Sequence, residues 1–311
     1  MFNTQTFLRQ TLYAPLDIPA PQSVELTMGT IEYAIYGSGK PLLIIHGGLG
    51  GYDQAILMFR QLLPEGYQLI CPSRPGYLGT PLATGRSIEE QVDALVALLD
   101  HLKIEHVTAI GFSAGGLILY PLAIRHPERI KALIGLDAIS GEYWGAEQRE
   151  RLRHNYLFGD MGLWMAKESM IYYPQMVIKK LMNSEGYLDP QMVDAGINQI
   201  MSDPRQLGFI ARMVNAITNY KARESGMLND LEQGENCRGF ALDKISCPAL
   251  IIHGTHDAEV KFYHGVFAYQ QLSSRNKQFF WLKYGTHMGI YFSPQAELGQ
   301  QQLRAFLEQF A

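Results

Sequence analysis

The sequence contains little that would direct the chain to a polyanion or to a disulfide framework. Its 311 residues carry a formal net charge of −4 and no run of lysine or arginine, so the basic surface that nucleic-acid binding requires is lacking. The three cysteines, Cys71, Cys237 and Cys247, form no Cys-x-x-Cys pair and cannot build an even disulfide framework. We therefore expect reduced thiols and no nucleic-acid partner.

Long apolar runs are also missing. No stretch approaches the ~20 apolar residues that a membrane-spanning helix needs. Residues 1–22 hold one basic residue, Arg9, and no apolar segment typical of a signal peptide. These absences predict a cytoplasmic protein without a membrane span. Prolines at positions 15, 19 and 21 predict that residues 1–22 form an extended arm.

The chain is 47% hydrophobic and 18% charged, which is typical of a globular protein, and its apolar runs alternate with helical patterns. Most of these runs are continuously apolar, as in strands buried on both faces of a parallel sheet. The first two alternate in character around a Met-Gly-Thr turn, which predicts an antiparallel hairpin. The alternation predicts an α/β fold: an eight-stranded, mostly parallel sheet with helices on both faces. The expected strands are residues 24–28, 31–36, 41–46, 67–71, 106–112, 130–136, 248–253 and 279–282.

The alternation of strand and helix patterns stops after the sixth expected strand. Residues 138–240 show helix signals and no strand pattern; Asp189-Pro190 and Asp203-Pro204 each place a capping residue before a proline that suits the first helical position. We therefore divide the chain into an N-terminal arm (1–22), an α/β core (23–137 and 241–311) and a helical cap inserted into the core (138–240).

The segment from Ala109 to Gly116 reads as a buried strand that runs into a tight turn and then a helix. It contains the pattern Gly-x-Ser-x-Gly, with Ser113 at the apex of the turn. A serine in such a turn has a strained backbone, and the chain passes so close that Gly111 and Gly115 must supply the room. The following helix points its N-terminus at any oxyanion formed there.

A serine hydroxyl needs a base that is itself oriented by a carboxylate. On a parallel sheet these groups come from loops at the carboxyl ends of strands, which share one edge. Two loops qualify: Gly254-Thr-His-Asp257 and the loop that ends in Gly285-Thr-His287. Asp137, just past the strand 130–136, is a rival acid. We favour Asp257 because it lies in the tighter Gly-x-x-Asp turn.

The order Ser113, Asp257, His287, together with a His-Gly-Gly loop after an early strand, resembles the α/β-hydrolase superfamily of the serine-nucleophile type with a helical cap. The resemblance covers the chain from about Val24 to the C-terminus and implies an eight-stranded α/β-hydrolase fold. It also implies that Ser113 is the nucleophile, His287 the general base and acid, and Asp257 the group that orients the imidazole.

The resemblance extends to the oxyanion hole, where one donor would be the backbone N–H of Ala114. The second would come from the loop after His46, from Gly48 in preference to Leu49. It further implies a cofactor-independent hydrolase that cleaves a carboxylic ester, or a related acyl bond, of a small to medium apolar substrate.

Departures from particular subfamilies narrow the activity. Relatives that open epoxides or displace halide have aspartate where this chain has Ser113. Proline iminopeptidases read His-Gly-Gly-Pro-Gly and have tryptophan after the nucleophile; here those positions are Leu49 and Ala114. Carbon–carbon bond hydrolases and cofactor-free haloperoxidases or perhydrolases use the same triad and stay open. So does a rival of another class, a ligand-binding protein that keeps the fold without turnover.

Other polar residues are weighed against simpler roles. His46 is expected to shape its loop and Arg74 to brace the turn around it. His253, His256 and His264 with Asp257 match no compact zinc motif, so we expect no metal and no cofactor. Some of the cap's aromatic and methionine side chains are expected to line an adaptable apolar pocket above Ser113. The candidates are Trp144, Met161, Trp164, Met165, Met170, Tyr172, Tyr173 and Met176.

Overall fold

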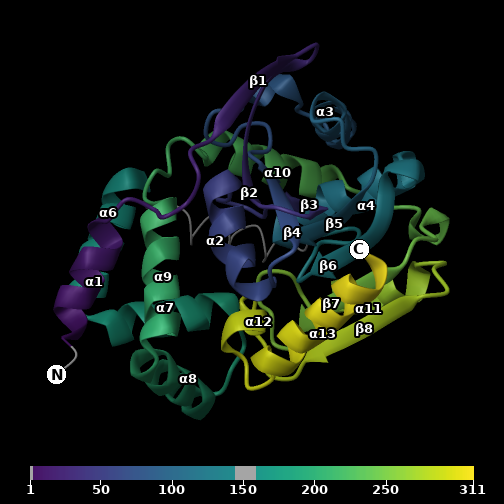
Figure 1. Cartoon of the computed structure of the whole chain (residues 1–311). Helices are drawn as coiled ribbons and strands as arrows, with labels where there is room; N and C mark the ends of the chain where they lie inside the picture. Colours follow the sequence, from purple (N-terminus) through teal and green to yellow (C-terminus); the bar gives the residue numbers. More distant parts are fainter. Residues whose placement is uncertain (1–2, 144–158) are drawn as a thin grey trace.

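The computed structural model describes residues 3–143 and 159–311, and an eight-stranded sheet forms its centre (Figure 1). The strand order is β1-β2-β4-β3-β5-β6-β7-β8. Strands β3 to β8 pair in parallel, whereas β2 pairs antiparallel with both β1 and β4. This confirms the predicted α/β fold and its first hairpin. The strands are β1 (Gln22–Leu26), β2 (Gly29–Gly37), β3 (Lys40–Ile45), β4 (Tyr67–Pro72), β5 (Val107–Phe112), β6 (Ile130–Leu136), β7 (Ala249–Gly254) and β8 (Lys277–Leu282).

Each face of the sheet is covered by helices because successive side chains of a strand point to opposite faces. In β3, Leu43 and Ile45 lie in one core cluster, with residues of α3 (Ile88–His101), α4 (Gly116–Arg125) and α11 (Tyr263–Gln271). Leu42 and Ile44 lie in the other, with residues of α2 (Tyr52–Leu62), α12 (Gly289–Phe292) and α13 (Ala296–Phe310). The central strands are therefore buried on both faces, as their continuously apolar sequences predicted.

The helix starts predicted from capping residues and prolines are observed. Ser87 and Glu90 form a capping box at the start of α3. Pro190 and Pro204 occupy the first positions of α8 (Pro190–Ser202) and α9 (Pro204–Ile217), and the Asp203 side chain accepts a hydrogen bond from the Arg205 N–H. The reason is that proline lacks the N–H that would be unpaired at a helix start.

Between β6 and β7 the described residues 159–236 are mostly helical, as predicted. We call helices α6 to α10 the insertion (residues 159–236). Besides α8 and α9 it contains α6 (Gly159–Tyr172), α7 (Pro174–Glu185) and α10 (Glu224–Asn236). Most of it packs as its own unit, with an apolar cluster that includes Met170, Ile178, Val193 and Leu207.

The prediction that residues 1–22 form an extended arm is wrong for half of that segment. Residues Thr4–Tyr13 form helix α1, capped by the Asn3 side chain, which accepts a hydrogen bond from the Thr6 N–H. Leu8 and Leu12, one helical turn apart, are fully buried in the apolar cluster of the insertion. Figure 1 shows α1 lying along α6 and α9. The physical reason is the i, i+4 spacing of the two leucines, which gives this short helix one apolar face.

Among the helices of residues 3–143 and 159–311, none has the length and apolar character needed to cross a bilayer.

Candidate active site

Ser113 follows β5 directly and has a positive φ of 55°. Such a conformation is strained for a residue with a side chain and is a feature of the turn that lifts a nucleophile above a sheet. A Cβ on Gly115 would lie 2.3 Å from the carbonyl oxygen of Ile45, and one on Gly111 would lie 2.8 Å from the Cβ of Leu119. Both glycines are therefore required for close approach, as predicted.

The loop after β3 approaches the serine with its main chain. A Cβ on Gly47 would lie 2.7 Å from the Cβ of Ser113, whereas one on Gly48 would meet no atom within 4 Å. Gly48 is partly exposed, while Leu49 is 7% exposed and has a φ of 54°. Gly48 therefore borders open space beside the nucleophile, as an oxyanion donor should. The assignment of Gly48 and Ala114 as donors stays a prediction.

His46 and Arg74 hold this loop. The Nδ1 of His46 lies 2.8 Å from the carbonyl oxygen of Gly47, and its Nε2 accepts a hydrogen bond from the Arg74 backbone N–H at 2.9 Å. The Nε of Arg74 donates to the His46 carbonyl at 3.0 Å. Burial, and then the charge of Arg74, lowers the pKa of His46 well below its usual range, so the ring is neutral. This confirms the expectation that His46 shapes its loop.

His287 and Asp257 come together from the loops after β8 and β7. The Nδ1 of His287 lies 2.7 Å from Oδ2 of Asp257, and both residues are buried. The other carboxylate oxygen accepts from the backbone N–H groups of Glu259 and Val260, at 2.8 and 2.9 Å. The imidazole of His287 lies 4.9 Å from the ring of Phe112, the residue before Ser113. A carboxylate thus orients an imidazole that packs against the residue before Ser113. The roles of Ser113, His287 and Asp257 as nucleophile, base and acid stay a prediction.

Asp137, the rival acid, has another partner. Its Oδ1 accepts a hydrogen bond from the backbone N–H of Gly254 at 2.7 Å. Burial raises its pKa well above the usual range, and the charge of Asp257 raises it further. Asp137 thus joins the end of β6 to the end of β7. The structure pairs His287 with Asp257 instead.

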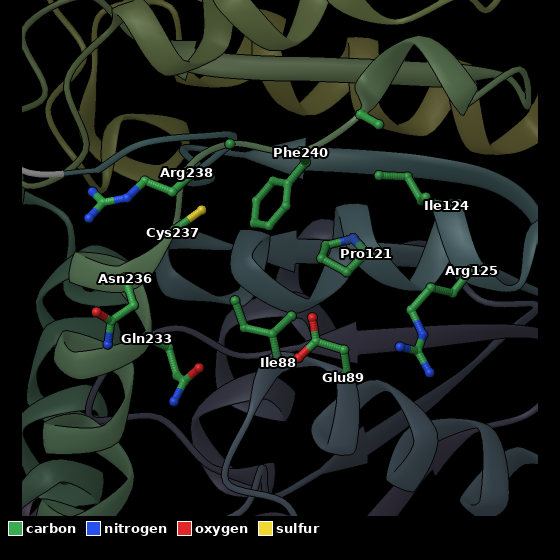
Figure 2. A pocket seen from close by; sticks show the side chains of 12 residues that line it. Ile88, Glu89, Pro121, Ile124, Arg125, Gln233, Asn236, Cys237, Arg238 and Phe240 are labelled. Atoms are coloured by element: carbon green, nitrogen blue, oxygen red, sulfur yellow. The ribbon is translucent and has the colours of Figure 1, made fainter.

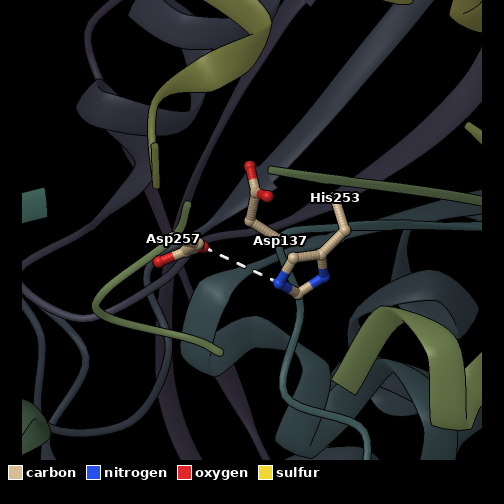
Figure 3. Close-up of side chains that lie close together, drawn as sticks. All are labelled: Asp137, His253 and Asp257. Atoms are coloured by element: carbon tan, nitrogen blue, oxygen red, sulfur yellow. Dashed lines mark ion pairs between the residues drawn. The ribbon is translucent and has the colours of Figure 1, made fainter. Parts of the chain in front are cut away.

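A buried cluster of Asp137, His253 and Asp257 has the composition of a metal site, and its donor atoms lie within 4.8 Å of one another (Figure 3). Its hydrogen bonds point to another role. The Nε2 of His253 lies 2.8 Å from the carbonyl oxygen of Val260 and 3.7 Å from Oδ2 of Asp257. Burial lowers the pKa of His253 to about 4. Since Asp257 already holds His287, we assign the cluster to the support of the triad.

The other two histidines considered for a metal point elsewhere. The Nδ1 of His256 lies 2.9 Å from the hydroxyl of Thr255. His264, fully buried in α11, accepts the backbone N–H of Ser140 at Nδ1, 3.2 Å away. Each ring thus serves its own local contact.

Sequence reasoning missed the charged residues of the insertion that reach the site. Asp230 pairs with Arg74 at 2.5 Å, and Arg223 pairs with Asp53 at 2.6 Å; all four side chains are buried. No local signal identifies these partners, because they are more than 150 positions apart in the chain.

Glu185 was also missed. It ends α7, and its backbone carbonyl accepts hydrogen bonds from the N–H groups of Ala258 and His287. Desolvation raises the pKa of its carboxyl to about 8, opposed by the nearby His287 and reinforced by Glu259. This glutamate lies beside the triad and carries a proton at neutral pH.

The predicted pocket residues whose side chains the structure describes do not enclose a pocket. Trp164, Met165, Tyr172, Tyr173 and Met176 are each at least 51% exposed. Met170 is fully buried in the apolar cluster of the insertion itself. Trp144 and the side chain of Met161 lie outside the described residues. The described aromatic and methionine side chains are therefore explained by helix packing and by exposed helix surface.

A cavity of about 430 Å³ lies away from the triad (Figure 2). It is lined by residues at the C-terminal end of α4, among them Pro121 and Arg125, and by Gln233 and Phe240 in and after α10. Ser113 precedes α4, and none of the three predicted catalytic residues lines this cavity.

The family profile that matches this chain and two similar proteins all carry the name hydrolase. The sequence profile described as alpha/beta hydrolase fold matches residues 40–294. An alpha/beta hydrolase fold protein from Nakamurella multipartita has a solved structure with a TM-score of 0.82 and 31% identity, covering 93% of this chain and 99% of that one. The uncharacterized hydrolase YcgS of Bacillus subtilis is 28% identical, covering 81% of this chain and 86% of its own.

A third relative covers a shorter part of the chain. The 2-hydroxymuconate semialdehyde hydrolase of a Pseudomonas species is 34% identical over 140 residues, which is 39% of this chain and 49% of that protein.

Proposed function

Because the chain belongs to the α/β-hydrolase fold family, we propose that it is a serine hydrolase that cleaves a carboxylic ester, or a related acyl bond, through an acyl-enzyme. The observation that carries the proposal is the hydrogen bond of 2.7 Å between His287 and Asp257, made beside a serine turn with a φ of 55°. Fold alone would leave the function open; this constellation is the chemical argument.

We propose a role for each group. Since Nδ1 of His287 donates to Asp257, its Nε2 carries the lone pair that removes the proton of the Ser113 hydroxyl. The serine oxygen bonds to the substrate carbonyl carbon, and the oxyanion is held by the N–H groups of Gly48 and Ala114. The carbon–oxygen bond of the ester then breaks, and the alcohol leaves with the proton from His287. Water, deprotonated by the same imidazole, releases the acid and restores Ser113.

The charges beside the oxyanion loop favour an apolar substrate. Arg74 and Arg223 lie close to that loop, but each is neutralised by a buried aspartate. Neither guanidinium is therefore free to hold a carboxylate or phosphate of a substrate. We propose a small to medium apolar acyl or alcohol group, enclosed between the core and the insertion, which acts as a cap.

The decisive test is covalent labelling. An alkyl fluorophosphonate, which phosphonylates an activated serine, should label the native protein stoichiometrically, and Ser113→Ala should abolish labelling. Ser225→Ala, which removes a hydroxyl from the insertion, is the matched control and should label normally. Labelling that survives in Ser113→Ala contradicts the assigned nucleophile. Native protein that never labels favours the ligand-binding rival.

The proposed role of the insertion as a cap predicts an acyl preference. Each additional buried methylene should add about 0.8 kcal/mol of binding until the cavity is full. Across p-nitrophenyl esters, kcat/KM should therefore rise from acetate to a short or medium chain and then fall. A steady rise through long-chain esters would indicate an open, lipase-like site.

A second candidate, carbon–carbon bond hydrolysis on the same residues, is favoured by the similarity to the 2-hydroxymuconate semialdehyde hydrolase. Its signature would be a Ser113 that labels with the phosphonate while p-nitrophenyl esters are not turned over. 2-Hydroxymuconate semialdehyde would then be the substrate to assay.

A further inference from the structure

A short segment of the insertion runs along the loop that carries Asp257. Residues 185–187 connect α7 to α8, and Gly186 forms an antiparallel bridge with Asp257. The N–H of Tyr187 donates to the carbonyl of His256 at 3.0 Å, and the N–H of Ala258 donates to the carbonyl of Glu185 at 2.9 Å. Main chain thus holds main chain on both sides of the aspartate.

The same segment holds the loop of His287. The carbonyl of Glu185 accepts a second hydrogen bond, from the backbone N–H of His287, at 3.2 Å. One carbonyl oxygen therefore joins the loop after β7 to the loop after β8. The two residues whose side chains meet at 2.7 Å are also fixed relative to each other through the backbone of the insertion.

Gly186 makes this approach possible. A Cβ at this position would lie 2.2 Å from Cγ2 of Thr286, 2.9 Å from Cβ of Thr286 and 3.1 Å from the carbonyl oxygen of His256. The backbone of Gly186, with φ −154° and ψ 163°, is extended and open to any residue. The need for glycine here is steric, because Thr286 directly precedes His287.

We infer that the segment 185–187 is a positioning element for the triad and that Gly186 is its positioning residue. The inference rests on the proposed function of Ser113, His287 and Asp257. Any side chain at position 186 must push the insertion away from Thr286. The hydrogen bond from the His287 N–H to the Glu185 carbonyl is then lost. The imidazole is no longer held at a fixed position relative to Ser113.

The expected effect falls on the chemical step. A displacement of about 1 Å at a catalytic group can lower a rate about 100-fold. Gly186→Ala should therefore reduce kcat, and the rate of phosphonate labelling, by about 10- to 100-fold. KM should change little, because the segment contacts the loops of Asp257 and His287 through backbone hydrogen bonds.

Two further variants make the test specific. Gly196→Ala is the matched control, since Gly196 lies inside α8 of the same insertion and its Cβ would meet only the flexible end of Met182. It should keep the native kcat. Thr286→Ser removes the methyl group that the new Cβ would strike first, so the double variant Gly186→Ala/Thr286→Ser should recover most of the lost rate.

A spectroscopic readout separates positioning from general destabilisation. The proton between Nδ1 of His287 and Asp257 should give a far-downfield ¹H NMR signal, identified by its loss in His287→Gln. In Gly186→Ala this signal should broaden or shift while the melting temperature stays near that of Gly196→Ala. Native kcat in Gly186→Ala, or an unchanged signal with a rate loss matched by Gly196→Ala, overturns the inference.

Failure of the proposed function is distinguishable from failure of this inference. If the native protein neither labels nor turns over esters, the proposed function fails. The downfield proton still reports whether Gly186 fixes His287 against Asp257, so the positioning role is decided either way.

Discussion

Two of the places where the insertion contacts the α/β core differ in chemistry. At the loop after β3 (residues 46–51) the contact consists of two buried ion pairs, Arg74 with Asp230 and Arg223 with Asp53. At the triad loops it consists of backbone hydrogen bonds around Gly186, with no charged side chain required. We call them the ionic joint and the backbone joint.

The difference shows two ways in which the insertion is held against the core. Buried charges are stable only in pairs, because either partner alone is left without solvent or counter-charge. The ionic joint is therefore sensitive to the loss of any one of four side chains. The backbone joint depends on the absence of a side chain at one position. It is sensitive to added atoms instead of removed ones.

The largest effect is expected at the backbone joint, in the triad acid. Asp257→Asn should lower kcat by up to about 10⁴-fold, because the imidazolium loses its stabilising charge and the correct tautomer. Asp137→Asn should do much less, because His287 is paired with Asp257 and an asparagine oxygen at position 137 still accepts the Gly254 N–H. Steady-state kinetics of both variants checks the ranking. The reverse order would reassign the acid to the end of β6.

The next effect tests the ionic joint. Asp230→Ala leaves Arg74 as an uncompensated buried charge, which should lower the free energy of unfolding by about 3–5 kcal/mol. Asp194→Ala is the control: its pair with Lys179 is exposed, with side chains 60% and 51% accessible. Its loss should be within about 1 kcal/mol. Urea unfolding measures both, and equal losses would show that burial gives the ionic joint no special role.

A double variant sharpens the same comparison. Arg74→Met/Asp230→Leu removes both buried charges and fills the space with apolar groups. Since replacing a buried pair is often neutral or stabilising, the double variant should unfold at higher urea than Asp230→Ala. A double variant as unstable as Asp230→Ala would mean that hydrogen bonds from Arg74 to the His46 loop, and not its charge, hold the joint.

A smaller effect depends on pH and lies at the backbone joint. The pKa of Glu185 is about 8 in the folded chain, above its usual value of 4.5. Between these values the folded state keeps a proton that the unfolded state loses, so stability falls as pH rises. Glu185→Gln removes this penalty. Its gain in melting temperature over the native protein should grow from about pH 5 to about pH 8. A gain independent of pH would contradict the raised pKa.

The smallest effect concerns His264, whose pKa burial lowers to about 3 from 6.5. In this range the unfolded state binds a proton that the folded state does not, so stability falls as pH falls. In His264→Asn the amide oxygen can still accept the Ser140 N–H, but nothing titrates. The variant's loss of stability should therefore shrink from about pH 7 to about pH 4, as followed by urea unfolding. A constant loss would indicate packing alone.

Local patterns predicted the parts of this molecule that depend on near neighbours. The continuously apolar strands and the capping box at Ser87 each involve residues within a few positions of one another. The arm shows the limit of this reasoning. Three prolines dominated residues 1–22, whereas Leu8 and Leu12 form a helix because the insertion provides an apolar surface for them.

The sequence by itself determined the sheet, the elbow at Ser113 and the chain order of the three candidate catalytic residues, because strand periodicity and turn sterics are short-range. Only the tertiary structure decided between Asp137 and Asp257, since both follow strand ends and differ in which backbone and imidazole groups surround them. It also decided the partners of Arg74 and Arg223 and the need for glycine at position 186. Those contacts join residues far apart in the chain, and burial gives them their energy, so no local pattern carries them.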